Sequence, residues 1–263
     1  MTVQSNFITD LANKIVLVTG GATHIGQAVV SELTTLGAEV IIADINETLG
    51  RQVAAATQAT YEYLDLANDD SIQALVSKLK HVDILVNLAC LYEDHGSQST
   101  RSDWLKTFNV TVFGHAALVQ ACRPLLKASS DAAVINISSV SARIAQKERW
   151  VYPASKATLE QLTKSMALDL AADHIRVHAL SLGWTWSVPM QMISGDDRPK
   201  TDRVAGRFHV LGRIADASEV AQALSLLCSP KAKLLTGSTI HADGGYHTLG
   251  PEATDSPIEE LSA

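Results

Sequence analysis

The feature that most constrains this chain is an alternation of short apolar runs with longer stretches of helical spacing. The runs are rich in β-branched residues and too continuously apolar for half-exposed strands, so we predict strands buried on both faces. They are Lys14–Thr19, Glu39–Ala43, Val82–Val86, Ala133–Ser138 and Ile175–Leu180. The helical stretches are Gln27–Leu36, Thr48–Thr57, Asp70–Lys80, Ser102–Leu126, Val151–Ala172 and Ser218–Cys228. Right-handed crossovers between such elements predict an α/β fold, a doubly wound parallel sheet with helices on both faces.

The same alternation bears on domain organisation. The 263 residues are at the upper end of what one α/β domain holds, and no repeat or Gly/Ser/Pro-rich linker divides them. We expect one domain over residues 1–250 and a polar, acidic tail at residues 251–263. The segment Gly183–Arg213 stands outside the alternation and carries Trp and Met residues. Its glycines and polar tip suggest a mobile substrate lid, ordered mainly when cofactor and substrate are bound.

Composition excludes several classes of protein. The net charge of −7 argues against binding to nucleic acid or to a membrane surface, because both are polyanionic. No apolar run approaches the roughly 20 residues that cross a bilayer, and Met1–Asp10 does not read as a secretory signal. We therefore expect a cytoplasmic protein. Cys90, Cys122 and Cys228 are too few and too scattered for a disulfide framework, and we expect no metal site.

A glycine-rich turn follows the first predicted strand. It reads Thr19-Gly20-Gly21-Ala22-Thr23-His24-Ile25-Gly26 and leads directly into a helix. Glycines permit a tight turn, and the N–H groups of the following helix N-terminus bind a pyrophosphate. Such a turn alone is weak evidence, but its place between the first strand and helix of a βαβ unit favours a dinucleotide site.

Two carboxylates follow the second and third strands. Asp44, followed by Ile45, is placed to accept hydrogen bonds from the adenosine ribose, although a helix-capping Asp is the alternative. Its charge would repel a 2′-phosphate, and no Arg or Lys follows before Arg51, so we expect NAD rather than NADP. Asp65 and Leu66 are candidates to contact the edge of the adenine. An Asp that only stabilises a turn is nearly as good an interpretation of Asp65.

A tyrosine and a lysine stand four residues apart at the start of a predicted helix. Tyr152 and Lys156 therefore share one face, where an ammonium group favours phenolate and lowers the pKa of the phenol. Ser139 adds a hydroxyl at the carboxyl edge of the sheet, where open α/β sheets bind ligands. Alone, such a Tyr/Lys pair is usually a pair of solvent-exposed residues without a function. Together with the glycine turn it predicts an acid/base site.

Taken together, these motifs resemble those of the short-chain dehydrogenase/reductase superfamily, in its short single-domain branch with a Rossmann fold. The resemblance covers Lys14 to Gly245. It includes the TGxxxGxG-like turn, the YxxxK pair, Ser139 thirteen residues before Tyr152, and the terminal Asp243-Gly244-Gly245. The resemblance implies cofactor contacts from Gly20, Thr23, His24, Ile25, Gly26, Asp44, Ile45, Asp65, Leu66, Asn87, Ala89, Tyr152, Lys156, Gly183, Trp184 and Ser187.

The resemblance also implies a mechanism, hydride transfer between a nicotinamide and a carbinol or carbonyl carbon. Tyr152 is the expected general acid/base, Ser139 orients the substrate oxygen, and Lys156 lowers the Tyr152 pKa and holds the nicotinamide ribose. Asn109 is expected to hold a water in a proton relay. We therefore expect an NAD(H)-dependent oxidoreductase that interconverts a secondary alcohol and a ketone. The alternatives are a catalytically weak NAD(H)-binding regulator on this fold and an NADPH-dependent carbonyl reductase.

Several residues depart from the family pattern. His24 replaces a glycine of the cofactor turn, and His tolerates positive φ poorly. Leu88 and Cys90 stand in place of Asn and Gly after the fourth strand, while Leu182 and Ser187 replace Pro and Thr after the sixth. None of these changes removes a catalytic group. Enoyl reductases of similar fold separate the Tyr and Lys by six residues, whereas three intervene here.

The substrate pocket is less constrained. Candidate substrate contacts are Ser139, Ser141, Trp150, Tyr152, Trp184 and Met190. The loop after the sixth strand carries four large apolar side chains, Trp184, Trp186, Met190 and Met192. They suit a cyclic or carbon-rich alcohol or ketone, but packing of the loop onto the domain or a neighbouring subunit is an equally good interpretation. Arg143, Lys147 and Arg149 read as a solvated charge run rather than a carboxylate site. The long apolar helices Ser102–Leu126 and Val151–Ala172, with the family resemblance, predict a homotetramer.

Overall fold

A seven-stranded parallel sheet organises the computed structural model, which describes residues 11–250 and Ala253. The strands run in the order β3-β2-β1-β4-β5-β6-β7. Their bounds are β1 (Ile15–Thr19), β2 (Glu39–Asp44), β3 (Thr60–Tyr63), β4 (Ile84–Asn87), β5 (Ala133–Ser139), β6 (Arg176–Leu182) and β7 (Thr239–Ala242). The predicted doubly wound α/β fold is confirmed. The expected tail at 251–263 lies, apart from Ala253, outside the described residues.

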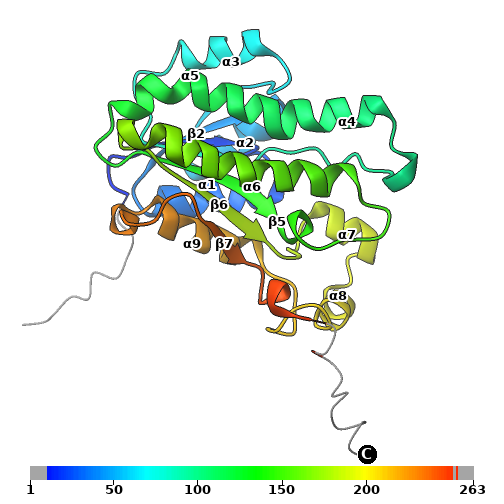
Figure 1. Cartoon of the computed structure of the whole chain (residues 1–263). Helices are drawn as coiled ribbons and strands as arrows, with labels where there is room; N and C mark the ends of the chain where they lie inside the picture. The colour runs from blue at the N-terminus through cyan, green and yellow to red at the C-terminus, as the bar shows by residue number, and fades with distance from the viewer. Residues whose placement is uncertain (1–10, 251–252, 254–263) are drawn as a thin grey trace, which may run out of the picture.

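Helices cover both faces of this sheet (Figure 1). One layer, packed in the first apolar core, contains α1 (His24–Thr35), α2 (Glu47–Thr57) and α9 (Ala217–Cys228). The opposite layer contains α3 (Asp69–Val76), α4 (Arg101–Phe108), α5 (His115–Lys127) and α6 (Val151–Leu170). Within the described residues, no helix is long and apolar enough to cross a membrane.

The first strand shows why the apolar runs are continuous. Val16 and Val18 point into the core beneath α1 and α9, whereas Leu17 points into the core beneath α5 and α6. All three side chains are fully buried. A strand between two helical layers needs apolar residues at every position, so the run does not alternate with polar residues.

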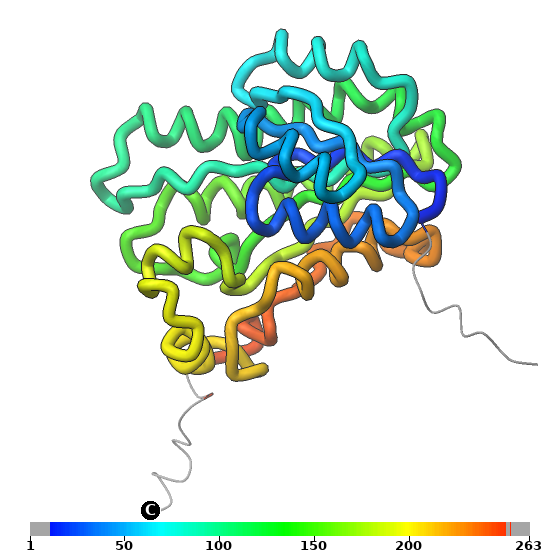
Figure 2. Tube along the Cα trace, turned by 180° about the vertical axis from the view of Figure 1, so that it is seen from behind, coloured from blue at the N-terminus to red at the C-terminus, as the bar shows by residue number. Residues whose placement is uncertain are grey.

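The predicted helix Ser102–Leu126 is interrupted in the structure. Between α4 and α5 lies one π-helical segment, η2 (Asn109–Gly114). The predicted Asp70–Lys80 helix is also shorter, because α3 ends at Val76. The segment after β6 forms two short helices, α7 (Val188–Ser194) and α8 (Arg198–Ala205). Seen from behind, these helices lie at one end of the molecule beside the C-terminal turns (Figure 2).

Candidate active site

The glycine turn after β1 presses against the loop after β4. Gly20 has φ +70°, and a Cβ there would lie 2.8 Å from the Ala89 backbone. A Cβ on Gly26 would collide with the Gly20 carbonyl oxygen, so the start of α1 also lies directly against the turn. Side chains are excluded at both positions. The result is a close-packed backbone surface at the N-terminus of α1, the arrangement that binds pyrophosphate.

Thr23 fixes the entry into α1. Its hydroxyl donates to the Gly20 carbonyl over 2.8 Å and accepts from the Gly26 N–H over 3.1 Å. His24 is the first residue of α1, and its φ is not positive, so the strain expected of a histidine in this turn is absent. Ile25 packs against the apolar core.

The carboxylate of Asp44 joins the ends of β1 and β2. One oxygen accepts from the Ala22 N–H over 3.0 Å, and the other from the Asn46 N–H over 2.9 Å. Asp44 is buried, whereas the neighbouring Ile45 is exposed. The carboxylate thus lies beside the glycine turn, and each oxygen retains a lone pair for a further donor.

Asp65, Leu66 and Asn87, the candidates at the ends of β3 and β4, make contacts within the protein. Asp65 accepts from the Ala67 N–H over 2.9 Å, which is the plain turn interpretation, and Leu66 is buried. Asn87 is fully buried and donates to Asn136 Oδ1 over 2.8 Å. The Asn87 amide nitrogen is used inside the sheet, whereas its Oδ1 is buried without a hydrogen-bond partner, so the contact of Asn87 with the cofactor stays a prediction.

Ser139, Tyr152 and Lys156 come together where β5 meets α6. Tyr152 and Lys156 lie on the buried face of α6, and the Lys156 ammonium lies 5.6 Å from the centre of the Tyr152 ring. That ammonium donates to the Ile137 carbonyl over 2.8 Å. Ser139 ends β5, and its hydroxyl donates to Ser141 Oγ over 3.2 Å, which in turn donates to Gln146. A phenol, a hydroxyl and an ammonium therefore share one buried corner.

Two further residues at this corner were not predicted as site residues. The ring of Tyr92 stacks on that of Tyr152, with centroids 4.9 Å apart. The neighbouring Cys90 thiol and Tyr152 phenol, together with burial, raise the pKa of Tyr92. The sequence pointed to this corner only through Cys90, which stands in place of the family's glycine after the fourth strand. Cys90 was interpreted as a small buried apolar residue, but it is only half-buried.

The pKa of Tyr152 departs from the expectation. Burial raises it above the ordinary phenol value, with the Cys90 thiol adding to the rise, while Ser139, Tyr92 and Arg149 act against it. Burial also lowers the pKa of the Lys156 ammonium. The predicted net lowering of the Tyr152 pKa is therefore not found, and Lys156 is not among the main causes of the shift. Desolvation outweighs the nearby charges, so the phenol is protonated and ready to donate.

Asn109 lies outside this corner. Its side chain is exposed and donates to the Ala67 carbonyl over 3.3 Å. The π-helical turn that begins at Asn109 instead buries Thr111, whose hydroxyl accepts from the Leu91 N–H over 3.4 Å. The prediction that Asn109 holds a relay water is corrected, because a wider turn changes which residues face inward.

A buried histidine, His115, lies between Thr111 of η2 and Thr19 of β1. His115 Nδ1 contacts the Thr111 carbonyl at 3.0 Å, and its Nε2 lies 3.4 Å from the Thr19 hydroxyl. Burial, together with the charge of Lys156, lowers the pKa of His115 to about 3. A neutral imidazole thus joins η2 to the strand that carries the glycine turn.

The segment after β6 places its aromatic residues in packing contacts. Trp184 lies against Phe208 at 5.7 Å between ring centroids, and the Arg198 guanidinium lies over Trp186 at 5.4 Å. A Cβ on Gly183 would lie 2.8 Å from the Asp243 carbonyl oxygen. Ser187 caps α7 without a side-chain hydrogen bond, Met190 is half-buried and Trp150 is exposed. Both tryptophans thus make packing contacts, and the predicted contact of Trp184 with cofactor and substrate stays a prediction.

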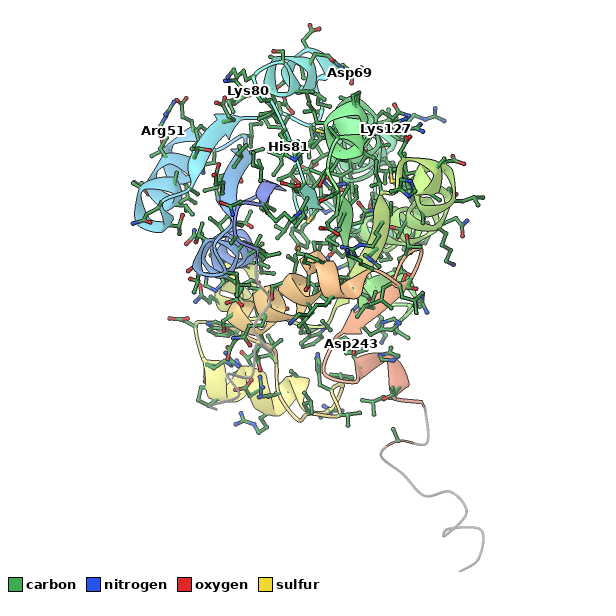
Figure 3. All side chains as sticks on the ribbon, turned by 90° about the vertical axis from the view of Figure 1, so that its left-hand side faces the viewer. Arg51, Asp69, Lys80, His81, Lys127 and Asp243 are labelled. Carbon is green, nitrogen blue, oxygen red and sulfur yellow. The ribbon has the colours of Figure 1, made fainter. Side chains whose placement is uncertain are left out.

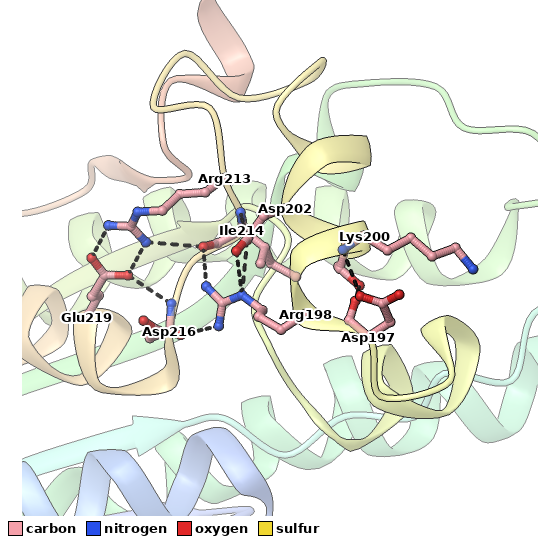
Figure 4. A network of polar contacts seen from close by, with 9 residues as sticks. Asp197, Arg198, Lys200, Asp202, Arg213, Ile214, Asp216 and Glu219 are labelled. Atoms are coloured by element: carbon pink, nitrogen blue, oxygen red, sulfur yellow. Dashed lines mark hydrogen bonds and ion pairs between the residues drawn. The ribbon is translucent and has the colours of Figure 1, made fainter.

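An ion-pair network ties the predicted lid to α9 (Figure 4). Arg198, the first residue of α8, pairs with Asp202 over 3.0 Å and with Asp216, the N-cap of α9. Arg213 pairs with Glu219 over 2.6 Å. The segment predicted as a lid is therefore held at α8, whereas α7, between Ser187 and Gly195, lies outside this network, and its closure over a ligand stays a prediction.

These features define a class of protein: a doubly wound α/β protein with a glycine turn of the dinucleotide-binding type and a buried Tyr/Lys pair. A family model described as "Enoyl-(Acyl carrier protein) reductase" matches residues 20–247. The chain belongs to the short-chain dehydrogenase/reductase superfamily of oxidoreductases, whose members bind nicotinamide cofactors.

Relatives of known name support this assignment. The chain is 32% identical over 248 residues to the cyclopentanol dehydrogenase of Comamonas sp., covering 89% of this chain and 97% of that protein. It is 31% identical to a tropinone reductase homologue of Arabidopsis thaliana, covering 91% and 92%. It is 30% identical to the trans-4-hydroxycyclohexanecarboxylate dehydrogenase of Sinomonas cyclohexanicum, covering 89% and 93%. A solved short-chain dehydrogenase/reductase family protein superposes with a TM-score of 0.83 at 33% identity, covering 90% and 99%.

Proposed function

We propose that this protein is an NAD(H)-dependent dehydrogenase that interconverts a carbocyclic secondary alcohol and its ketone. The observation that carries the proposal is the corner where Tyr152 and Lys156 of α6 lie beside Ser139 of β5. This corner lies at the carboxyl edge of the sheet, the same edge as the glycine turn, where open α/β sheets bind ligands.

Each side chain has a task that its surroundings support. The protonated Tyr152 donates to the carbonyl oxygen in the reductive direction and takes the proton back in the oxidative direction. Ser139 orients that oxygen by a hydrogen bond. Lys156 holds positive charge beside the phenol and is itself positioned by the Ile137 carbonyl. The nicotinamide, when bound, supplies or accepts the hydride.

The residues present fit an NAD cofactor. Gly20 and Gly26 leave backbone surface for the pyrophosphate, and Asp44 lies beside them for the ribose hydroxyls. Asp44 disfavours a 2′-phosphate by charge. Arg51, the first cation after Asp44 in the sequence, pairs with Glu47 over 2.8 Å. These contacts support NAD over NADP.

The choice of a carbocyclic alcohol rests on the aromatic surroundings and on the relatives. Tyr92 provides a ring face stacked on Tyr152, and Trp150 lies exposed two residues before it. Two of the relatives named above are dehydrogenases of ring alcohols by their names. The three residues between Tyr152 and Lys156 separate this chain from enoyl reductases that carry six.

The test is turnover of cyclopentanol, cyclohexanol and acyclic secondary alcohols with NAD and with NADP. We expect NAD-dependent oxidation of a ring alcohol, reduced by about 10²–10⁴-fold in Tyr152→Phe, the usual contribution of a general acid–base group. Tyr63→Phe, an exposed tyrosine on β3, is the matched control and should retain activity. A folded Tyr152→Phe protein with activity within about tenfold of the parent would overturn the proposed role of Tyr152.

We also propose a homotetramer of cytoplasmic location acting on a small-molecule substrate. Large apolar side chains are exposed on the α4–η2–α6 layer, among them Leu105, Phe113 and Leu168. Exposed apolar groups on long helices are typical of subunit interfaces.

A further inference from the structure

Two histidines and an aspartate converge where β7 ends. His241 lies on β7, Asp243 follows it, and His247 lies in the short turn η6 (Tyr246–Thr248). One ligand atom from each lies within 4.8 Å of the other two. The two imidazole rings stack with centroids 4.0 Å apart and an interplanar angle of 18°. Figure 3 labels Asp243 in this C-terminal part of the molecule, away from the labelled Arg51 and Asp69.

Backbone contacts hold the carboxylate of Asp243 in place. Its side chain is 1% exposed. Oδ1 accepts from the Gly245 N–H over 3.0 Å, and Oδ2 accepts from the His247 N–H over 3.1 Å. His247 Nδ1 lies 2.8 Å from the same Oδ2. A carboxylate oriented by its own turn is preorganised for a ligand.

His241 is the unexplained member. Its Nδ1 is buried and makes no hydrogen bond, because the Asp243 Oδ2 atom is 3.8 Å away. An unpaired buried ring nitrogen is costly unless something binds to it. The charges facing this ring are Asp243 and Glu160 on the acidic side and Arg143 on the basic side. Arg143 is itself paired with Glu160 over 3.0 Å, which offsets its repulsion of a cation.

We propose that His241, Asp243 and His247 bind one zinc-class divalent metal ion through Nδ1, Oδ2 and Nδ1. Two imidazoles and one carboxylate suit Zn²⁺ or Co²⁺, whereas Mg²⁺ and Ca²⁺ require more oxygen ligands. Ligand atoms of a tetrahedral zinc lie about 3.3 Å apart for bonds near 2.0 Å, and the two Nδ1 atoms lie 2.8 and 3.8 Å from Asp243 Oδ2. The two rings, now stacked at 18°, must turn on binding so that both Nδ1 lone pairs point at the same ion. His247 is 37% exposed, which leaves solvent access for a water as fourth ligand.

The metal ion has a structural role. It ties the end of the edge strand β7 to η6, next to the Asp243 carbonyl against which Gly183 packs. No group of the proposed catalytic corner is a ligand, so hydride transfer does not depend on it directly. The expectation of no metal site was based on cysteine count, which overlooks a His/Asp set separated by two and four residues.

The test uses the full chain without a polyhistidine tag, stripped with a chelator and titrated with Co²⁺ and Zn²⁺. We expect one saturable site per chain, visible absorption typical of low-coordinate Co²⁺, its displacement by Zn²⁺, and no effect of excess Mg²⁺. His247→Gln should weaken the affinity at least about tenfold, since even outer partners of metal ligands are worth that much. His174→Gln changes an exposed histidine outside the cluster and should bind normally.

Two results would overturn the proposal. One is the lack of saturable Co²⁺ or Zn²⁺ binding at micromolar concentration in the parent chain. The other is binding that is equal in the parent and in His247→Gln, which would mean that other surface groups hold the metal. His247 is partly exposed, so this variant should fold; should it fail to fold, His241→Gln replaces it under the same criteria. Thermal unfolding with and without Zn²⁺ gives a second readout, because a bound ligand raises the midpoint.

Discussion

The carboxylate of Asp94 accepts a hydrogen bond from the backbone N–H of Tyr152 over 2.9 Å. It accepts another from the Trp150 N–H over 3.0 Å. Helix α6 has no cap from its own N-cap side chain, so a residue 58 positions away in the β4–α4 loop supplies it. The loop that carries Cys90 and Tyr92 thereby fixes the end of the helix that carries Tyr152, the proposed proton donor. Asp94 is a positioning residue, because it acts through the backbone of Tyr152.

Replacing Asp94 should therefore affect catalysis as well as stability. We expect Asp94→Ala to lose about 1 kcal/mol of unfolding free energy, the typical cost of a lost helix cap. Its kcat should fall by about tenfold with little change in cofactor KM, since a poorly placed acid weakens the transition state rather than binding. The control is Asp103→Ala, which removes the capping-box carboxylate of α4. Equal kcat in both variants would contradict the positioning role.

The protonation of Tyr152 is open to direct measurement. Because burial raises its pKa, the cofactor-free chain should form no Tyr152 phenolate below about pH 10. The ultraviolet titration of the parent minus that of Tyr152→Phe isolates this group. A difference signal that appears near neutral pH would show that Lys156 outweighs desolvation after all.

Cofactor preference should depend on Asp44. We expect the parent to favour NADH over NADPH by roughly ten- to hundredfold, corresponding to about 1–3 kcal/mol of charge repulsion. Asp44→Ala should narrow that ratio, whereas Asp65→Ala, a turn residue at the same edge, should leave it unchanged. Fluorescence titrations with both reduced cofactors measure the effect. Tighter NADPH binding by the parent would contradict the assignment.

His115 should make the fold sensitive to acid. The folded-state pKa of about 3 lies below the ordinary value of 6.5, so the unfolded chain binds the extra proton first. The stabilising contribution of neutral His115 is complete above pH 6.5 and is lost as the pH falls towards 3. Denaturant unfolding across this range should show a steeper loss in the parent than in His115→Gln. His174→Gln, at an exposed position, should behave like the parent.

The oligomeric state is tested by light scattering. Four copies of the 28.1 kDa chain are expected at micromolar concentration. A charge at Phe113, exposed on η2, should shift the mass downward without unfolding the chain. A parent protein that scatters as a single chain would rule out the tetramer.

Sequence periodicity predicted the fold well and the site unevenly. Strand runs such as that of Val16–Val18 were recognisable because burial on both faces leaves a continuous apolar pattern. Tyr152 and Lys156 were recognisable because regular helical spacing places them on one face. Asn109 was assigned from the family resemblance, and its motif did not show that the Asn109 side chain is exposed while Thr111 is buried. Asp94 and Tyr92 were missed because only the folded loop brings them to α6.

The buried amide chain beneath the site has a consequence for how the chain folds. Asn87 donates to Asn136, and Asn136 donates to Thr163 of α6 over 2.9 Å. A slip of β5 by one residue would turn these polar groups to the wrong face and leave them without partners, at high cost in an apolar interior. The two hydrogen bonds therefore favour the observed register of β5 over a register shifted by one residue. Ser139 lies only three residues further along β5, so the register that Asn136 favours also fixes the position of the Ser139 hydroxyl at the end of the strand.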